Sequence, residues 1–278
     1  MAPLNIDWSA PWLAPYRGVG EAVESSLRAG ASVADALNGA LAQRCGTPGA
    51  APLAAGITAL QRFVPQGDLA EGTAYESHIA RTGCVPTRDN AHDLFNGLVW
   101  LTFPALKGRL NALHAAQIAR DGVGAQRGAM RDALTLFDEN AALWQAPPVL
   151  VDALRQRDWT ALFITHRALW SECRLTLIGH ALLEKLLAPR KAITAHVWPL
   201  HGEVDAALPE ELLRSHRGWL PLPVLGVPDW WNPNEQIGFY DDAAVFRAAS
   251  GHLENQPPGV TTASSGFDRI VQPRRLPS

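Results

Sequence analysis

Short polar side chains follow one face of the segment Pro86-Thr-Arg-Asp-Asn-Ala-His-Asp-Leu-Phe-Asn-Gly. They stand at the i, i+3, i+4 and i+7 spacing of a helix face: Asp89, His92, Asp93 and Asn96. Asp, His and Asn form helices less readily than Lys or Glu, so their use on a merely solvated face is locally disfavoured. We interpret the stripe as a candidate site, and an ordinary solvated face is the alternative interpretation.

A second candidate lies in Leu177-Ile-Gly-His-Ala-Leu-Leu-Glu-Lys, where His180 and Glu184 share a face at i, i+4. The rest of this stretch is largely apolar, and buried polar groups need partners. A His and a carboxylate one turn apart can ligate a metal together or form an acid–base pair. The alternative is a core histidine hydrogen-bonded to Glu184 as a structural lock. His196 is a candidate third member.

Two further polar stripes follow Pro104 and Gly128. The first places Lys107, Asn111 and His114 at i, i+4 and i+7. The second also has helical spacing, and a solvated charged face is its favoured interpretation: Arg131, Asp132, Thr135, Asp138 and Glu139. Polar stripes on antiparallel helices can converge. The later pair Asp241 and Asp242 is expected to cap a helix.

These residues make a metal-dependent hydrolase the leading hypothesis. A divalent ion that activates water would be held by some of six candidate ligands: His92, Asp93, His114, His180, Glu184 and His196. Among the catalytic candidates, Asp93 would act beside Arg88, Lys107 or Arg131, cations that stabilise an anionic substrate or transition state. A small anionic substrate such as a phosphate ester fits this chemistry.

The rival hypothesis is a non-catalytic ligand-binding or protein-interaction protein. In that case the segment from Trp219 to Trp231 would supply aromatic anchor area, and the polar residues would be structural locks. Familiar catalytic signatures do not decide the matter, because the chain contains no GxGxxG, GxxxxGK[ST], GxSxG, HExxH or EF-hand pattern. Whether the chain is an enzyme therefore stays open, and the residues indicate no cofactor other than a divalent ion.

The elements that must position these residues read as helices. Apolar spacing predicts helices at about 73–82, 90–102, 105–120, 129–141 and 148–156, one or two short helices within 20–43, and a long helical pattern from Trp159 to Leu187. After Pro189 the composition shifts to Pro, Gly and Trp, which disfavours regular helix. We therefore expect a mainly α fold and a single domain, 1–278. Its helical core (about 70–190) would be wrapped by an irregular Pro/Trp-rich segment (190–255) and followed by a frayed tail (256–278).

Charge and composition limit the partners. A net charge of -3 provides no global positive field for nucleic acid, and three scattered cysteines suggest neither a disulfide framework nor a cysteine-rich zinc site. The apolar stretch from Leu175 to Leu187 is interrupted by polar residues and is too short to span a membrane. With no secretion signal at the N-terminus, we expect a cytoplasmic protein. A small-molecule partner is expected, and the oligomeric state stays open.

Several longer motifs carry a family resemblance. The run PTRDNAHDLFNGLVWLTFP, with RDALTLFDENAAL, GHALLEKLLAP, TAH and LPVLGVP downstream, resembles the proteobacterial family of unknown function designated DUF3025, over most of the chain. The resemblance implies no established activity. The His92-Asp93 doublet also invites comparison with HD-type phosphohydrolases, which are helical and bind metal through His, His-Asp and Asp ligands. His78 would only loosely stand for the first ligand, and Asp132 or Asp138 for the last.

Overall fold

Two β-sheets lie among the helices of the computed structural model, which describes residues 4–45, 58–122, 128–200 and 219–249. In the smaller sheet, β1 (Arg62–Pro65) pairs in parallel with β2 (Cys84–Thr87). The larger sheet has the order β4-β3-β5-β6. Its central pair, β3 (Ala141–Gln145) and β5 (Thr194–Pro199), is parallel, whereas β4 (Arg174–Leu177) and β6 (Leu220–Pro223) are antiparallel to their neighbours.

The predicted mainly α fold is therefore wrong, and the chain is a mixed α/β protein. The strands β2, β3 and β4 fall inside the supposed helical core, and β5 and β6 fall inside the segment expected to be irregular. Four of the five residues of β3 are buried, so this strand reads as a continuous apolar run. Such runs cannot be told from buried helix by periodicity alone.

The expected long helix from Trp159 to Leu187 is wrong for the same reason. The structure divides this stretch into a π-helical turn (Ala161–Thr165), a 3-10 helix (Arg167–Glu172), strand β4 and the short helix α8 (His180–Lys185). Strand β4 gains its hydrogen bonds from β3, a partner that a local apolar pattern does not reveal. His180 and Glu184 therefore belong to a helix of six residues that begins directly after the sheet.

The other predicted helices are confirmed to within about two residues at each end. They are α3 (Tyr75–Thr82), α4 (Ala91–Thr102), α5 (Pro104–Asp121), α6 (Ala129–Asn140) and α7 (Pro148–Gln156), and the N-terminal pair is α1 (Arg17–Arg28) and α2 (Val33–Cys45). Local signals set these ends. The Asn90 side chain caps α4 by accepting from the Asp93 amide at 2.8 Å, and Pro104 occupies the first position of α5.

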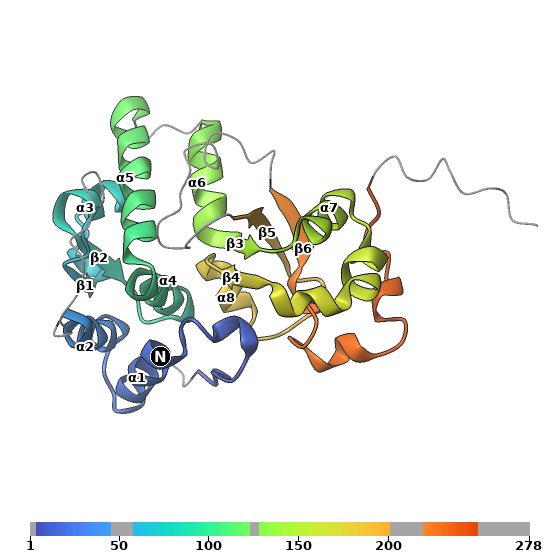
Figure 1. The fold of residues 1–278 in the computed structure, drawn as a ribbon. Coiled ribbons are helices and arrows are strands. Elements are labelled where there is room, and N and C mark those ends of the chain that lie inside the picture. The colour runs from blue at the N-terminus through green and yellow to red at the C-terminus, as the bar shows by residue number, and fades with distance from the viewer. Residues whose placement is uncertain (1–3, 46–57, 123–127, 201–218, 250–278) are drawn as a thin grey trace, which may run out of the picture. The chain divides into compact units, whose positions relative to one another are not determined.

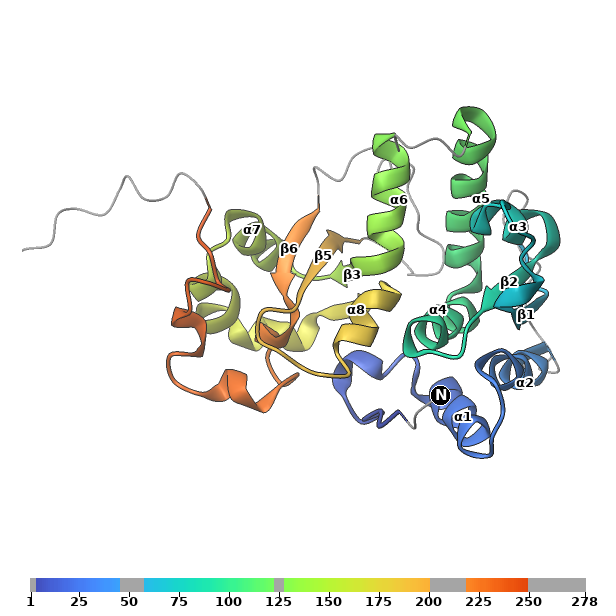
Figure 2. The same cartoon turned by 180° about the vertical axis from the view of Figure 1, so that it is seen from behind.

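Helix α4 packs against four other helices. Nearly every residue from Asp93 to Leu101 is buried, and α1, α2, α5 and α8 all contact this helix. Figures 1 and 2 show the four-stranded sheet beside α6, α7 and α8, and the two-stranded sheet beside α2 and α3. The Tyr16 hydroxyl donates to the Leu177 carbonyl at 2.6 Å and so joins the N-terminal segment to β4.

The connection from β4 to α8 approaches the end of α6 closely. A Cβ added at Gly179 would lie 2.4 Å from both the Asn140 nitrogen and the Glu139 oxygen, which are backbone atoms that cannot give way. The amides of Ile178 and Gly179 both donate to the Ala141 carbonyl at 2.9 Å. Only glycine permits this approach, and it places His180 directly against the last turn of α6.

Contacts group Met1–Ala248 into one unit. The predicted frayed tail, 256–278, lies outside the described residues, as does 201–218 within the supposed wrapping segment, so the expectation of one domain over 1–278 stays a prediction. None of the described helices is long and apolar enough to cross a membrane.

Substituting Gly179→Ala should destabilise the protein, because the added methyl group forces α8 away from the end of α6. Overpacking of this kind costs about 1–3 kcal/mol, measurable as a lower urea midpoint at unchanged slope. The matched control is Gly39→Ala on the exposed face of α2, where an added Cβ meets nothing within 4 Å. This control should be neutral or stabilising by up to about 1 kcal/mol. Equal midpoints for the two variants would contradict the close approach at Gly179.

Candidate metal centre

Three potential metal ligands from three helices meet at one point. His92 lies in the first turn of α4, Glu139 in the last turn of α6, and His180 is the first residue of α8. The Nε2 atoms of the two imidazoles are 2.9 Å apart, and Glu139 Oε2 lies 3.6 Å from His180 Nε2. The three groups each offer one ligand atom within 4.8 Å of the others, so a single ion between them is geometrically feasible.

Carboxylates face the other nitrogen of both imidazoles. Glu184 Oε2 lies 2.9 Å from His92 Nδ1, within hydrogen-bond distance. Asp138 Oδ1 lies 3.8 Å from His180 Nδ1, and this buried nitrogen has no hydrogen-bond partner among the described residues. The arrangement of carboxylate, imidazole and a shared central point is the one found where a second layer of residues orients metal-ligating histidines.

Burial controls the protonation of this cluster. It lowers the pKa of His180 to about 4, although the neighbouring Asp138 carboxylate opposes that shift. His180 is therefore a neutral imidazole at pH 7, the form that binds metal. Burial also raises the pKa of Glu139, and the negative charge of Asp138 adds to that effect.

Asp138 connects the cluster to a buried lysine. Its side chain is hydrogen-bonded to Lys107 Nζ, and Lys107 on α5 is only 4% exposed. Burial opposes the ionisation of Asp138, but Lys107 and His180 outweigh burial and lower its pKa to about 2. The Lys107 ammonium also lies 5.6 Å from the centre of the Trp100 ring, a cation–π distance.

Behind Asp138 lies a small cavity of about 10 Å³ whose lining includes Glu76, Lys107, Asn111 and His114. Asn111 donates to Glu76 Oε2 at 2.6 Å. Burial, reinforced by the charge of Asp138, raises the pKa of Glu76 to about 7. Burial likewise lowers the pKa of His114. The volume is at the lower limit for one water molecule, so this region is a polar packing cluster and leaves no room for a substrate.

The structure brings together some of the predicted site residues and separates others. His92, His180 and Glu184 meet in the cluster, whereas His114 lines the small cavity and His196 lies on β5, where Asn140 Nδ2 is 2.8 Å from its Nδ1. His78, the loose stand-in for a first HD-type ligand, is buried on α3, and its Nε2 has no hydrogen-bond partner among the described residues.

The predicted catalytic residues Asp93, Arg88, Lys107 and Arg131 are not ligands of this cluster. Asp93 accepts two hydrogen bonds from the Arg88 guanidinium, at 2.9 and 3.1 Å, and one from the Arg88 amide. Lys107 is committed to Asp138, and Arg131 is half-buried on α6, near enough to His114 to influence its protonation. Asp93 and Arg88 thus form a lock at the start of α4.

Sequence reasoning missed the contribution of Glu139 and Asp138, which it assigned to a solvated face. One local signal was present. The two acids occupy the last turn of α6, where the helix macrodipole disfavours negative charge. Acidic residues at that position need nearby cations to stabilise them, and a pair of them before a buried strand indicates a site.

The raised pKa of Glu76 predicts a specific dependence of stability on pH. The folded state keeps a proton up to about pH 7 that the unfolded chain, in which the pKa of this glutamate has its ordinary value of 4.5, has already released. This contribution to stability is complete below about pH 4.5 and is lost as the pH rises through 7. Glu76→Gln should remove it, and the change in unfolding free energy between pH 5 and 8 should differ from the parent protein by about 2 kcal/mol. The control is Glu71→Gln, which changes an exposed glutamate. If the unfolding free energies of the parent and of Glu76→Gln changed with pH in parallel, the raised pKa of Glu76 would be contradicted.

Comparison with known proteins yields one match. The family described as "Protein of unknown function (DUF3025)" matches residues 61–250, a range that contains all the residues of the cluster. Searches of curated proteins and of solved structures give no match. The matched range covers more than half of the 278 residues, so the chain belongs to the DUF3025 family.

Proposed function

We propose that this chain is a metal-dependent hydrolase whose divalent ion is held by His92, His180 and Glu139. The observation that carries the proposal is the meeting of their three ligand atoms within 4.8 Å. Two histidines and one glutamate are the ligand set of several hydrolytic zinc sites, in which a fourth position stays open for water or substrate. The His92 and Glu139 side chains are 32% and 38% exposed, so that position is accessible from solvent.

The tautomers of the two histidines support this ligand set. With the proton of His92 on Nδ1, where it donates a hydrogen bond to Glu184, His92 Nε2 carries a lone pair and can accept a hydrogen bond from His180 Nε2. That arrangement leaves His180 Nδ1 without a proton while it faces Asp138, which explains why this buried nitrogen lacks a partner. An ion on both Nε2 atoms would let each Nδ1 keep a proton for its own carboxylate.

The separation of the two nitrogens is also close to what an ion requires. Nitrogen ligands at 2.0–2.1 Å from a tetrahedral zinc lie roughly 3.3 Å from each other. The observed separation of the Nε2 atoms is 2.9 Å, so an outward shift of a few tenths of an ångström would accommodate the ion. Glu139 Oε2, at 3.6 Å from His180 Nε2, is already near the required distance.

A divalent ion in this position would supply Lewis acidity and would lower the pKa of a bound water to about 7. Residues around the ligands would orient them. Glu184 would orient His92, and Asp138 would orient His180. Lys107 keeps Asp138 ionised and fixed in place, so this orienting carboxylate is charged above about pH 2.

We propose a small anion, such as a phosphate ester, as the substrate. His92 lies in the first turn of α4, where the positive end of the helix macrodipole favours anions. Lys185 follows Glu184 on α8, is exposed, and is close enough to favour the ionised form of Glu139 against burial and Asp138. We therefore assign the binding of the anionic substrate to Lys185. Arg88 and Lys107 are already engaged by Asp93 and Asp138.

Purified without a histidine tag and supplied with zinc, manganese or iron, the protein should bind one ion per chain. His180→Ala removes a ligand and should weaken binding by more than about 100-fold, whereas Glu184→Gln removes only an orienting partner and should weaken it by about 10- to 100-fold. His166→Ala changes a half-buried histidine that is not one of the cluster residues and is the matched control. Failure of the parent protein to bind any of the three metals would refute the metal centre.

The metal-loaded protein should hydrolyse esters in a panel that includes p-nitrophenyl phosphate, its bis-ester and p-nitrophenyl acetate. A chelator should abolish turnover, and readdition of the metal should restore it. At saturating metal, Lys185→Ala should raise KM for the phosphate esters by about 5- to 10-fold and leave the neutral acetate ester unaffected, because it removes one exposed cation. Stoichiometric metal binding without hydrolysis of any ester would retain the metal centre and refute the hydrolase.

A further inference from the structure

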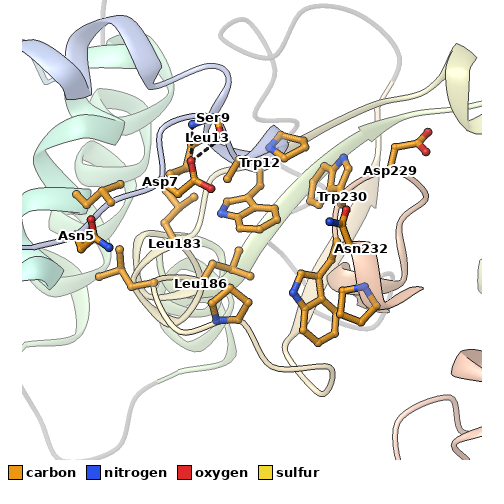
Figure 3. A pocket seen from close by; sticks show the side chains of 17 residues that line it. Asn5, Asp7, Ser9, Trp12, Leu13, Leu183, Leu186, Asp229, Trp230 and Asn232 are labelled. Atoms are coloured by element: carbon orange, nitrogen blue, oxygen red, sulfur yellow. Dashed lines mark hydrogen bonds between the residues drawn. The ribbon is translucent and has the colours of Figure 1, made fainter. Parts of the chain in front are cut away.

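A second cleft, of about 650 Å³, lies between the N-terminal segment, the end of α8 and the turn that follows β6. Its volume is within the range of sites for small molecules. Leu183 and Leu186 contribute to its wall, whereas His180 and Glu184 of the same short helix belong to the metal centre. The cleft therefore uses a different face of α8 (Figure 3) and is a separate place on the molecule.

Tryptophan rings form much of the wall of this cleft. Trp12 from the N-terminal segment and Trp230 from the turn have ring centres 6.1 Å apart and planes inclined at 49°, so the two rings form an open V. Trp231 also lines the cleft, and its ring packs against Phe239. Figure 3 shows the Trp12 ring between Asp7 on one side and Trp230 on the other.

The charged residues that line the cleft are all negative. Asp7 and Asp229 are both exposed lining residues, and no Lys, Arg or His occurs among the lining residues, all of which lie in the described part of the chain. The Ser9 amide and hydroxyl donate to Asp7 Oδ1 at 3.0 and 2.5 Å. These bonds lower the pKa of Asp7 and leave its second oxygen uninvolved in either bond. The cleft thus has a fixed negative charge that no lining cation neutralises.

The walls are held in place before any ligand arrives. Buried Asn234 donates to the carbonyls of Leu225 and Val227, at 3.0 and 2.7 Å, and so fixes the turn that carries Trp230 and Trp231. Trp12 is only 7% exposed, so packing fixes its orientation. A rigid wall reduces the entropy cost of binding.

We propose that this cleft binds a small organic cation, an alkylammonium group on an apolar body, with the half-buried Trp230, which packs on Trp12, facing the cation and Asp7 balancing its charge. Trp offers the strongest cation–π attraction of the aromatic side chains, and quaternary ammonium groups are recognised by cages of such rings. An anion would be repelled by Asp7 and Asp229. A purely apolar ligand would gain no attraction from either carboxylate. The proposal does not depend on the metal centre.

The test is calorimetric titration of the metal-free full chain with choline and benzyltrimethylammonium. Each is compared with 3,3-dimethylbutan-1-ol, which has the shape of choline without its charge. At least one cation should bind, and the neutral analogue should bind at least about ten-fold more weakly, because it lacks the attraction to the rings and the carboxylate. Equal affinity for choline and its neutral analogue, no binding of either cation, or stronger binding of a neutral disaccharide such as cellobiose would overturn the proposal.

Variants locate the binding in this cleft. Asp7→Asn is isosteric, exposed and still able to accept from Ser9, so it should fold normally and weaken cation binding by about three- to five-fold. Trp230→Leu should weaken binding by about ten-fold, and Trp230→Phe by less, because Phe keeps an aromatic face. Asp68→Asn changes an exposed aspartate that does not line the cleft and should leave affinity unaltered. Unchanged affinity in Asp7→Asn and Trp230→Leu would place the cation elsewhere and overturn the proposal.

Discussion

The charge of Asp138, whose side chain is only 17% exposed, is the constraint on which this part of the molecule depends. Its carboxylate lies where α5, α6 and α8 meet, hydrogen-bonded to Lys107 and 3.8 Å from His180 Nδ1. An isolated carboxylate at such a position would be very costly to bury. The pairing with Lys107 makes it tolerable, and removal of either partner would leave the other charge buried without compensation. The three helices are thus held to one arrangement by electrostatics as well as by packing.

The same charge, together with burial, shifts the pKa values of the groups around it. With burial, it keeps Glu76 protonated to about pH 7 and raises the pKa of Glu139, while burial keeps His180 neutral despite the attraction of Asp138. The result is a neutral imidazole and a carboxylate next to each other, with a second imidazole, His92, at 2.9 Å. These are the protonation states and donor atoms that a divalent ion needs. Burial keeps His180 neutral, whereas the charge of Asp138 opposes both the neutral form of His180 and the ionised form of Glu139.

Sequence patterns pointed to several residues of the proposed site, but they did not show which side chain each of these residues contacts. His180 and Glu184 stood out because polar groups in an apolar stretch require partners, and the obvious inference was that they bond to each other. In the structure Glu184 bonds to His92, 92 residues away, and His180 faces Asp138 and Glu139. Helical spacing tells which residues share a face but not what that face meets, because the meeting depends on tertiary packing.

The fold was predictable where local signals were strong. Among helices α3 to α7, α4 has an Asn cap, and α5 and α7 begin with proline, whereas β3 and β4 are short strands whose hydrogen-bond partners are distant in sequence. The wrong prediction of one long helix also affected the expected position of His180. A continuous helix over 159–187 would have placed His180 in its interior, but the end of β4 and the glycine that follows deliver His180 at the first residue of a new helix, against α6.

Local rules are broken where the candidate ligands gather. Two acids in the last turn of α6 oppose the macrodipole, and a glycine approaches that turn more closely than any side chain would allow. Departures of this kind concentrate at functional sites. Lys107 offsets the negative charge of Asp138. It does not offset the charge of Glu139, whose pKa is raised by burial and by Asp138. A divalent cation between Glu139 and the two imidazoles would supply the positive charge that this helix end lacks.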